Sequence, residues 1–428
     1  MYFLCGDFFK HTKYQSFNQT KAVNFPVFVA RRIRQPQQAT FSATVSRVGI
    51  ASIALGVAVG IVALSVLFGF KDTIYQKVFL FGSHIQVSKL SLNQSFEESP
   101  ILLHTPVYDQ WQKIPGIRHR QAVAHKAGIL KTPDELQGAV IKGVGRDYDW
   151  DLLKESLVEG RPIQFSDTSY AEEIILSRVI AQKLNLKVGD NVVMYFVQNP
   201  PRVRKLNIVG IYETNLEEFD NQLVLGDIGL VQRLNGWGAD SVGAYEYFVN
   251  DFNQLESSAK TLYSQLPADM RMERVTDRFR PLFEWLQLLD QNTSVLLVLV
   301  LFVTCFNIAS VLLVMMMERT PMVGLLTTLG SPNAQIRRIL FFVGIQLSVK
   351  GVLIGNFIGI GLCWVQARFK LIPLDATNYF MNTVPIVFDW KAILLLNAGI
   401  ILLIALILLL PTLIISRIRP VQALVFKK

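Results

Sequence analysis

Residues 48–70 read VGIASIALGVAVGIVALSVLFGF, a stretch of apolar and small residues without a single charge. A helix rises about 1.5 Å per residue, so a run of this length crosses a hydrocarbon core of roughly 30 Å. Two further uncharged runs span 291–317 and 392–416, and a fourth, 339–367, carries one charge, Lys350. The sequence therefore predicts an integral membrane protein with four transmembrane helices.

The composition supports this class. Hydrophobic residues make up 51% of the chain and charged residues 18%, below the roughly 25% that is typical of soluble domains. The net charge of +9 does not indicate a nucleic-acid partner, because basic residues gather beside the apolar runs. None of the three cysteines, Cys5, Cys305 and Cys363, falls within 71–285, so no disulfide is predicted there.

Lysine and arginine residues in the short flanks predict the orientation. They are concentrated before the first run, between the second and third, and after the fourth: Lys10, Lys13, Lys21, Arg31, Arg32, Arg34 and Arg47; Arg319, Arg337 and Arg338; Arg417, Arg419, Lys427 and Lys428. We therefore expect segments 1–47, 318–338 and 417–428 in the cytoplasm. The segments 71–285 and 368–391 are expected on the far side.

The segment 71–285 is long enough for an α+β domain inserted between the first and second helices. Its predicted strands are rich in Val, Ile and aromatic residues: 84–90, 137–144, 191–197, 205–212 and 244–249, with a strand leading into a helix over 172–186. We expect two lobes. One is built from about 84–150 and 240–280, and the other is an insertion of about 151–240.

Catalytic and metal-binding patterns are missing from the sequence. It contains no HExxH motif and no nucleophile elbow, and its five histidines lack metal-ligand spacing. Gly143-Val144-Gly145 lacks the third glycine of a dinucleotide loop. We predict no catalytic residue, no metal site and no cofactor bound by this chain.

Small residues recur at intervals of four in two of the apolar runs. They are Ser52, Gly56 and Gly60 in the first and Gly351, Gly355 and Gly359 in the third. Such spacing lets two helix backbones approach closely, although glycine is also common in membrane helices generally. We predict that both sets lie in helix-packing seams.

Two polar side chains stand at mid-depth. Lys350 lies about 11 residues into its run, and Asn307 lies about 10 residues from the cytoplasmic end of the second, so the two could meet. A charge there is costly and marks either a function or a buried partner. No acidic residue occurs in the runs, which argues against an ion-coupled transporter.

The loop after the second run predicts a short amphipathic helix. Thr320-Pro321 favours a helix start, Gly330 favours a left-handed end, and Ser331-Pro332 restarts a helix. Its apolar stripe is formed by Met322, Leu325, Leu326 and Leu329. The stripe either lies on lipid and neighbouring helices or docks a cytoplasmic protein. A second amphipathic segment, 25–34, is typical of an interfacial helix.

The order of these features resembles the permeases of the MacB/FtsX/Lol class of ABC transporters, and in particular the lipoprotein-releasing, LolC/LolE-like permeases in their Bacteroidetes form. The resemblance covers about residue 25 to the end. It is carried by FVARRIR (28–34), LSVLFGF (64–70), FGSHIQV (81–87), EGRP (159–162), LNLKVGD (184–190), ERTPMVGLLTTLG (318–330) and RIRPVQAL (417–424). Phe68 stands where the family has asparagine.

The resemblance implies partners and a function. Such permeases work in pairs, as two copies or as paralogues, with cytoplasmic ATPase subunits (LolD-like) that bind ATP and Mg. They extract lipoproteins from the lipid of the bacterial inner membrane and hand them to a periplasmic carrier (LolA-like). The stretch from Glu318 and Arg319 to Gly330 would be the helix that couples to the ATPase. The sequence has no GxxxxGK[ST] motif, so a separate ATPase is implied.

Two further sites follow from the resemblance. The family member that recruits the carrier has a long hairpin, but the corresponding segment here, 198–205, is short; Arg202 and Arg204 are the candidate carrier contacts. Acyl chains need an apolar cavity open to lipid, for which Phe68, Phe70 and Phe302 are the candidates.

Three rival functions stay open. A MacB-like exporter of small molecules or peptides shares the four-helix plan but normally carries a fused ATPase. An FtsX-like scaffold that controls a periplasmic partner usually has a much smaller outer domain. A membrane-bound enzyme would need a catalytic constellation, and none is recognisable in the sequence.

Overall fold

The computed structural model describes the chain except residues 1–40, 92–97, 167–168, 319 and 416–428. The expected interfacial segment 25–34 and the RIRPVQAL stretch therefore lie outside the described residues. The chain forms two compact units. The first contains the chain up to Leu64 together with Ser294–Cys363 and the part from Asp389 onward, and the second contains Ser65–Thr293 and Trp364–Phe388.

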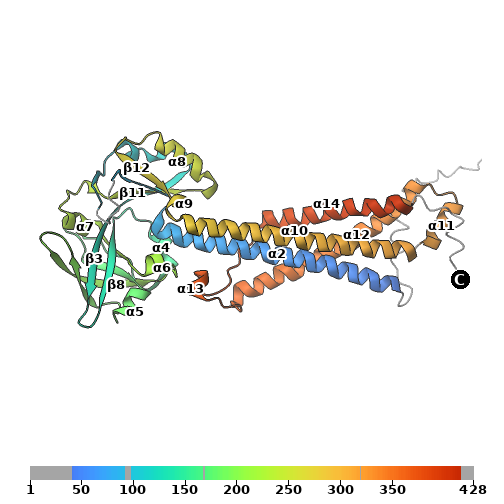
Figure 1. Ribbon diagram of the computed structural model, residues 1–428, viewed down its shortest axis with the longest axis horizontal. Coiled ribbons are helices and arrows are strands. Elements are labelled where there is room, and N and C mark those ends of the chain that lie inside the picture. Colours follow the sequence, from blue (N-terminus) through green and yellow to red (C-terminus); the bar gives the residue numbers. More distant parts are fainter. Residues whose placement is uncertain (1–40, 92–97, 167–168, 319, 416–428) are drawn as a thin grey trace, which may run out of the picture. The chain divides into compact units, whose positions relative to one another are not determined.

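Four helices dominate the first unit, and Figure 1 shows them side by side. They are α2 (Phe41–Gly82), α10 (Arg280–Glu318), α12 (Asn333–Phe369) and α14 (Trp390–Ile415), and a short helix, α11 (Thr320–Thr328), follows α10. All four are long and apolar enough to cross a membrane. The helices α2, α10 and α12 exceed the predicted apolar runs, because the polar residues that flank those runs continue the same helix.

The second unit is built on β-strands. Its strands are β1 (Ile85–Lys89), β2 (Ile101–Leu102), β3 (Ile117–Lys131), β4 (Leu136–Val144), β5 (Leu157–Gly160), β6 (Glu173–Ser177), β7 (Asn191–Phe196), β8 (Arg202–Tyr212), β9 (Leu223–Asp227), β10 (Ser241–Val242), β11 (Ala244–Val249) and β12 (Met270–Arg274). Its short helices are α3 (Pro106–Asp109), α4 (Trp150–Lys154), α5 (Arg178–Lys183), α6 (Glu217–Asp220), α7 (Ile228–Asn235), α8 (Leu255–Tyr263), α9 (Val275–Arg278) and α13 (Ala376–Tyr379). Each predicted strand is present.

Ten of these strands form one sheet, in the order β12-β1-β11-β3-β4-β9-β6-β8-β5 with β7 off this path, and β2 and β10 pair in a separate two-stranded sheet. Strand β7 pairs with both β3 and β8, which closes β3, β4, β9, β6, β8 and β7 into a barrel. The barrel has its own hydrophobic core, which includes the fully buried Met194, Phe196 and Leu206. A second core lies between the rest of the sheet and its helices.

The predicted division into two lobes needs a correction. Residues 151–240 do not form the second lobe alone, because the barrel also takes β3 and β4 from outside that range. The reason is the length of β3, 15 residues. Its first half pairs with β11 and its second half with β4 and β7, so one strand serves both cores.

The segment between α12 and α14 belongs to the second unit. Met381 is buried in the larger core, and the Lys77 ammonium donates to the Phe380 carbonyl at 2.6 Å. The Val387 amide donates to the Ser65 carbonyl at 3.1 Å. The segment 368–391, which we expected on the far side of the membrane, is thus bonded to the part of α2 that belongs to the second unit.

Candidate functional site

The short helix α11 has the predicted C-terminus. Gly330 has φ of +86°, its amide donates to Thr327 at 3.0 Å, and the Ser331 amide donates to Leu326 at 3.0 Å. This pair of bonds is a Schellman motif, which satisfies the last carbonyls of a helix. The predicted left-handed end is therefore confirmed, and α12 restarts at Asn333.

The residues of the apolar stripe of α11 differ in their solvent exposure. Leu325 and Leu329 are 56% and 74% exposed, whereas Met322 and Leu326 are half-buried. Of the other coupling candidates, Glu318 is the last residue of α10, and Arg319 lies outside the described residues. Leu325 and Leu329 are thus exposed on a short helix with a defined C-terminal end, as far as the described residues of the chain are concerned.

The glycines of α12 form a close seam with α2. A methyl group added at Gly355 would lie 2.6 Å from the Ala54 carbonyl oxygen, and one added at Gly359 would lie 3.1 Å from the Ala58 Cα. Gly351 likewise contacts Ile53. At this seam the backbones approach closely because no side chain separates them.

The small residues of α2 face other helices. Ser52 accepts a hydrogen bond from the Asn307 amide of α10 at 2.9 Å. Gly56 packs against Thr304 of α10, and Gly60 against Leu396 of α14. The two predicted sets of small residues therefore do not meet each other, and α2 contacts α10, α12 and α14 through different faces.

These contacts give Asn307 a partner on α2, and the expected meeting of Asn307 with Lys350 stays a prediction. Asn307 bonds to Ser52 of α2, and Gly351, next to Lys350, packs against Ile53 of the same helix. Both α10 and α12 thus approach α2 at this level.

Sequence reasoning missed a second polar pair within the helices. Asn356 of α12 and Asn397 of α14 donate to each other's side-chain carbonyl at 2.8 and 2.9 Å. Each also bonds to the carbonyl four residues earlier on its own helix. An asparagine in each of two apolar runs was the available signal, but nothing in the sequence pairs them.

The three phenylalanines proposed for an acyl-chain cavity lie in different surroundings. Phe70 packs edge-on against Tyr379 with ring centroids 6.5 Å apart, Phe68 is half-buried, and Phe302 is 71% exposed. A crevice between α2, α10 and α14 of about 10 Å³ is lined by Gly56, Gly60 and Thr304 among others, not by these rings. That volume holds about one water molecule, far less than an acyl chain.

The arginines of the β7–β8 hairpin have local partners. The Arg202 guanidinium donates to the Arg233 carbonyl at 2.5 Å and to the Leu234 carbonyl at 3.4 Å, at the end of α7. Arg204 donates to the Val203 carbonyl at 2.8 Å. Basic side chains stabilise helix C-termini in this way, so the structure gives Arg202 a capping contact.

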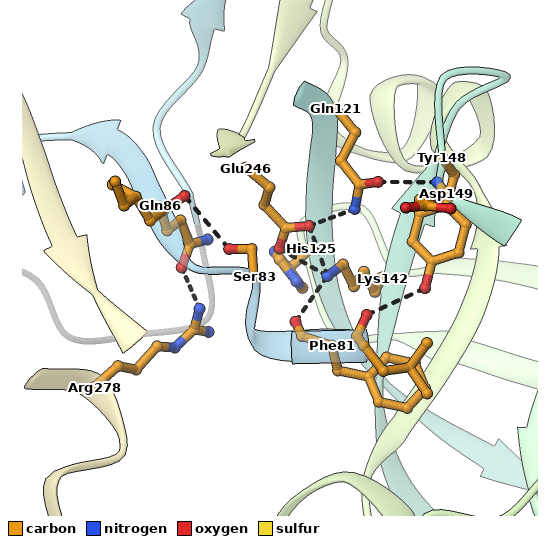
Figure 2. A network of polar contacts seen from close by, with 12 residues as sticks. Phe81, Ser83, Gln86, Gln121, His125, Lys142, Tyr148, Asp149, Glu246 and Arg278 are labelled. Carbon is orange, nitrogen blue, oxygen red and sulfur yellow. Dashed lines mark hydrogen bonds and ion pairs between the residues drawn. The ribbon is translucent and has the colours of Figure 1, made fainter. Parts of the chain in front are cut away.

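A polar network that the sequence did not predict surrounds the end of α2 (Figure 2). The Lys142 ammonium of β4 donates to the Glu246 carboxylate of β11 at 2.7 and 2.9 Å and to the Phe81 carbonyl at 2.8 Å. Burial lowers the pKa of Lys142, and the Glu246 carboxylate opposes that shift. A charge inside each of the apolar strands AVIKGV and AYEYFV was the only signal in the sequence.

The comparisons define the class of this protein. The family described as "MacB-like periplasmic core domain" matches residues 50–282, and "FtsX-like permease C-terminal" matches residues 294–420. The first of these covers more than half of the chain. The chain therefore belongs to the family of MacB/FtsX-type ABC transporter permeases, and the resemblance predicted from the sequence is confirmed.

The alignments with similar proteins cover most of the chain. The lipoprotein-releasing system transmembrane protein LolE of Haemophilus influenzae is 24% identical over 94% of this chain and 99% of its own length. LolC of Xylella fastidiosa is 22% identical over 92% and 97%, and LolC of Neisseria meningitidis serogroup B is 25% identical over 83% and 88%. The similarity thus includes both the helices and the sheet unit.

Proposed function

We propose that this chain is a transmembrane subunit of an ABC transporter that extracts lipoproteins from the inner membrane and passes them to a periplasmic carrier. The observation that carries the proposal is the similarity to lipoprotein-releasing permeases over almost the full length of both chains. A match confined to the sheet unit would equally fit an exporter or a signalling scaffold.

The proposal includes a topology and a set of partners. The four long helices cross the membrane, both termini are cytoplasmic, and the unit with the ten-stranded sheet is inserted between the first and second spans on the periplasmic side. The excess of Lys and Arg in the flanks supports this orientation. A second permease, two ATPase subunits that bind ATP and Mg, the lipoprotein, lipid and the carrier complete the system.

The test is transfer of a triacylated lipoprotein from nanodiscs into the soluble fraction. The nanodiscs contain this chain, its co-purified ATPase and the lipoprotein, and the carrier is added. We expect transfer that requires ATP and stops without this subunit. ATP hydrolysis without transfer of any of several lipoproteins would contradict the proposal and favour a MacB-like exporter or an FtsX-like scaffold.

Within this proposal α11 is the helix that contacts the ATPase. Its support is the exposure of Leu325 and Leu329 on a helix with a fixed end. We expect Leu325→Asp with Leu329→Asp to abolish co-purification of the ATPase and leave the melting temperature unchanged, because exposed positions tolerate charge. Leu136→Asp, at a leucine of β4 that is 65% exposed, is the matched control and should retain the ATPase. Retention by the double variant would show that α11 is misassigned.

A further inference from the structure

The end of helix α2 is bonded to the sheet through side chains. The last carbonyls of a helix have no partner within it and need one from elsewhere. Here the Lys142 ammonium donates to the Phe81 carbonyl at 2.8 Å, and the Tyr148 hydroxyl donates to the Leu80 carbonyl at 3.3 Å (Figure 2). Both contacts lie within the second unit, at the last turn of α2.

The lysine that holds this helix end is completely buried. Lys142 and Glu246 have exposed fractions of 0% and 1%. Glu246 also accepts a hydrogen bond from the Gln121 amide at 2.7 Å, and the Gln121 carbonyl accepts from the Asp149 amide at 3.1 Å. Strands β3, β4 and β11 are thereby joined to one helix terminus in a single network.

Stability alone does not account for this arrangement. Taking an ammonium and a carboxylate out of water costs several kcal/mol for each ion, and an apolar pair of similar volume is often as stable or more stable. An apolar pair, however, makes no directional hydrogen bonds that could fix the position of a neighbouring carbonyl group. Lys142 has bonds to both Glu246 and the Phe81 carbonyl, so the last turn of α2 has a fixed position on the sheet.

We propose that Lys142 and Glu246 are positioning residues that clamp the end of α2 to the sheet, so that a shift of this helix during the ATP cycle moves the sheet with it. The inference rests on the proposed transport function. Helix α2 is continuous from Phe41 to Gly82, so a displacement along its first part reaches the clamp without an intervening break. In this proposal the clamp transmits the movement of α2 to the sheet and does not contact the substrate.

The experiment replaces the ion pair by an apolar pair, Lys142→Met with Glu246→Leu, in the full complex in nanodiscs. We expect unchanged basal ATP hydrolysis and a melting temperature between those of Lys142→Met and the wild type, because the Phe81 carbonyl and the Gln121 side-chain amide lose their partners. Lipoprotein released per ATP hydrolysed should fall at least fivefold. Unchanged release per ATP in a stable double variant would overturn the proposal.

Two further variants serve as a control and as a milder test of the clamp. Arg178→Met with Glu213→Leu removes a partly exposed ion pair, 2.8 Å long, elsewhere in the same unit, and should leave release per ATP unchanged. Tyr148→Phe removes only the hydroxyl that bonds to the Leu80 carbonyl. This milder variant still tests the clamp if the double clamp variant fails to fold. Tyr148→Phe should also reduce the lipoprotein released per ATP hydrolysed, by a smaller factor than the double clamp variant. Wild-type release per ATP in Tyr148→Phe would count against the clamp.

A second readout separates the clamp from the proposed substrate. Hydrogen–deuterium exchange of β4 and β11 should change when ATP is added to the wild-type complex, and the change should vanish in the double clamp variant. If the wild type releases no lipoprotein, the proposed function fails, but loss of this exchange response would still support the clamp. A response that persists in the double variant would refute it.

Discussion

Helix α2 is held in two different ways along its length. In the first unit, Gly355 and Gly359 of α12 bring backbones into contact with Ala54 and Ala58. In the second unit, the last turn of the same helix is bonded by a buried lysine, Lys142. The first contact joins backbone and apolar groups, whereas the second adds directional hydrogen bonds from buried side chains to the apolar packing of Leu80 and Phe81.

The difference follows from what each part of the helix needs. Inside a bilayer the lipid is as apolar as the side chains, so helices associate through close packing and a few hydrogen bonds. A helix end that is covered by a folded domain instead leaves carbonyls without partners, which must be satisfied. We therefore expect volume changes to matter at the seam and charge changes to matter at the helix end.

The largest effect is expected from breaking the ion pair on one side only. Lys142→Met leaves Glu246 buried without a cation, which should destabilise the sheet unit by about 3–5 kcal/mol. Thermal unfolding of the detergent-solubilised chain would measure this. The double variant with Glu246→Leu should recover part of the loss, because it removes the unpaired charge but leaves the Phe81 carbonyl and the Gln121 side-chain amide without partners. A single variant as stable as the wild type would mean that the pair contributes no electrostatic constraint.

The next largest effect is expected at the glycine seam. Gly355→Ala places a methyl group 2.6 Å from the Ala54 carbonyl oxygen, so the helices must separate, at a cost of about 1–3 kcal/mol. Gly361→Ala on the same helix meets nothing within 4 Å and should cost nothing. The comparison is made by thermal unfolding in one detergent. Equal melting temperatures for the two variants would contradict a close seam.

A smaller effect is expected from the amide pair between α12 and α14. Replacing Asn356 and Asn397 by leucine, singly and together, should give a coupling of about 0.6 kcal/mol and no more than about 1.7 kcal/mol. A double-mutant cycle on unfolding isolates the pair term. A coupling as large as that of Lys142 with Glu246 would contradict the contrast between the two parts of the molecule.

The smallest effect is expected from an exposed ion pair. Lys154 and Asp151 lie 2.5 Å apart on α4, with exposed fractions of 73% and 81%. Solvent screens such a pair and its side chains lose entropy, so Lys154→Ala should leave the melting temperature unchanged within error. A clear loss here would show that burial is not what distinguishes Lys142.

Local patterns made several features predictable. The apolar runs, the strand segments and the left-handed end at Gly330 depend on residues that are close together in the sequence. The length of an apolar run, the alternation of apolar and polar residues, and the freedom of glycine to adopt positive φ are all local properties. The same holds for the small residues of α2 and α12, whose spacing indicated packing faces but not the helices that they contact.

By itself the sequence determined the apolar runs, six of the twelve strands in the described residues and the left-handed end of the short helix at Gly330, because each follows from neighbouring residues. Only the tertiary structure decided which distant residues meet. Lys142 and Glu246 are 104 positions apart, and the barrel closes because β3 pairs with both β4 and β7. The sequence shows one charge in each of two apolar strands, but only folding brings these two charges together, because β4 and β11 lie on either side of β3 in the sheet.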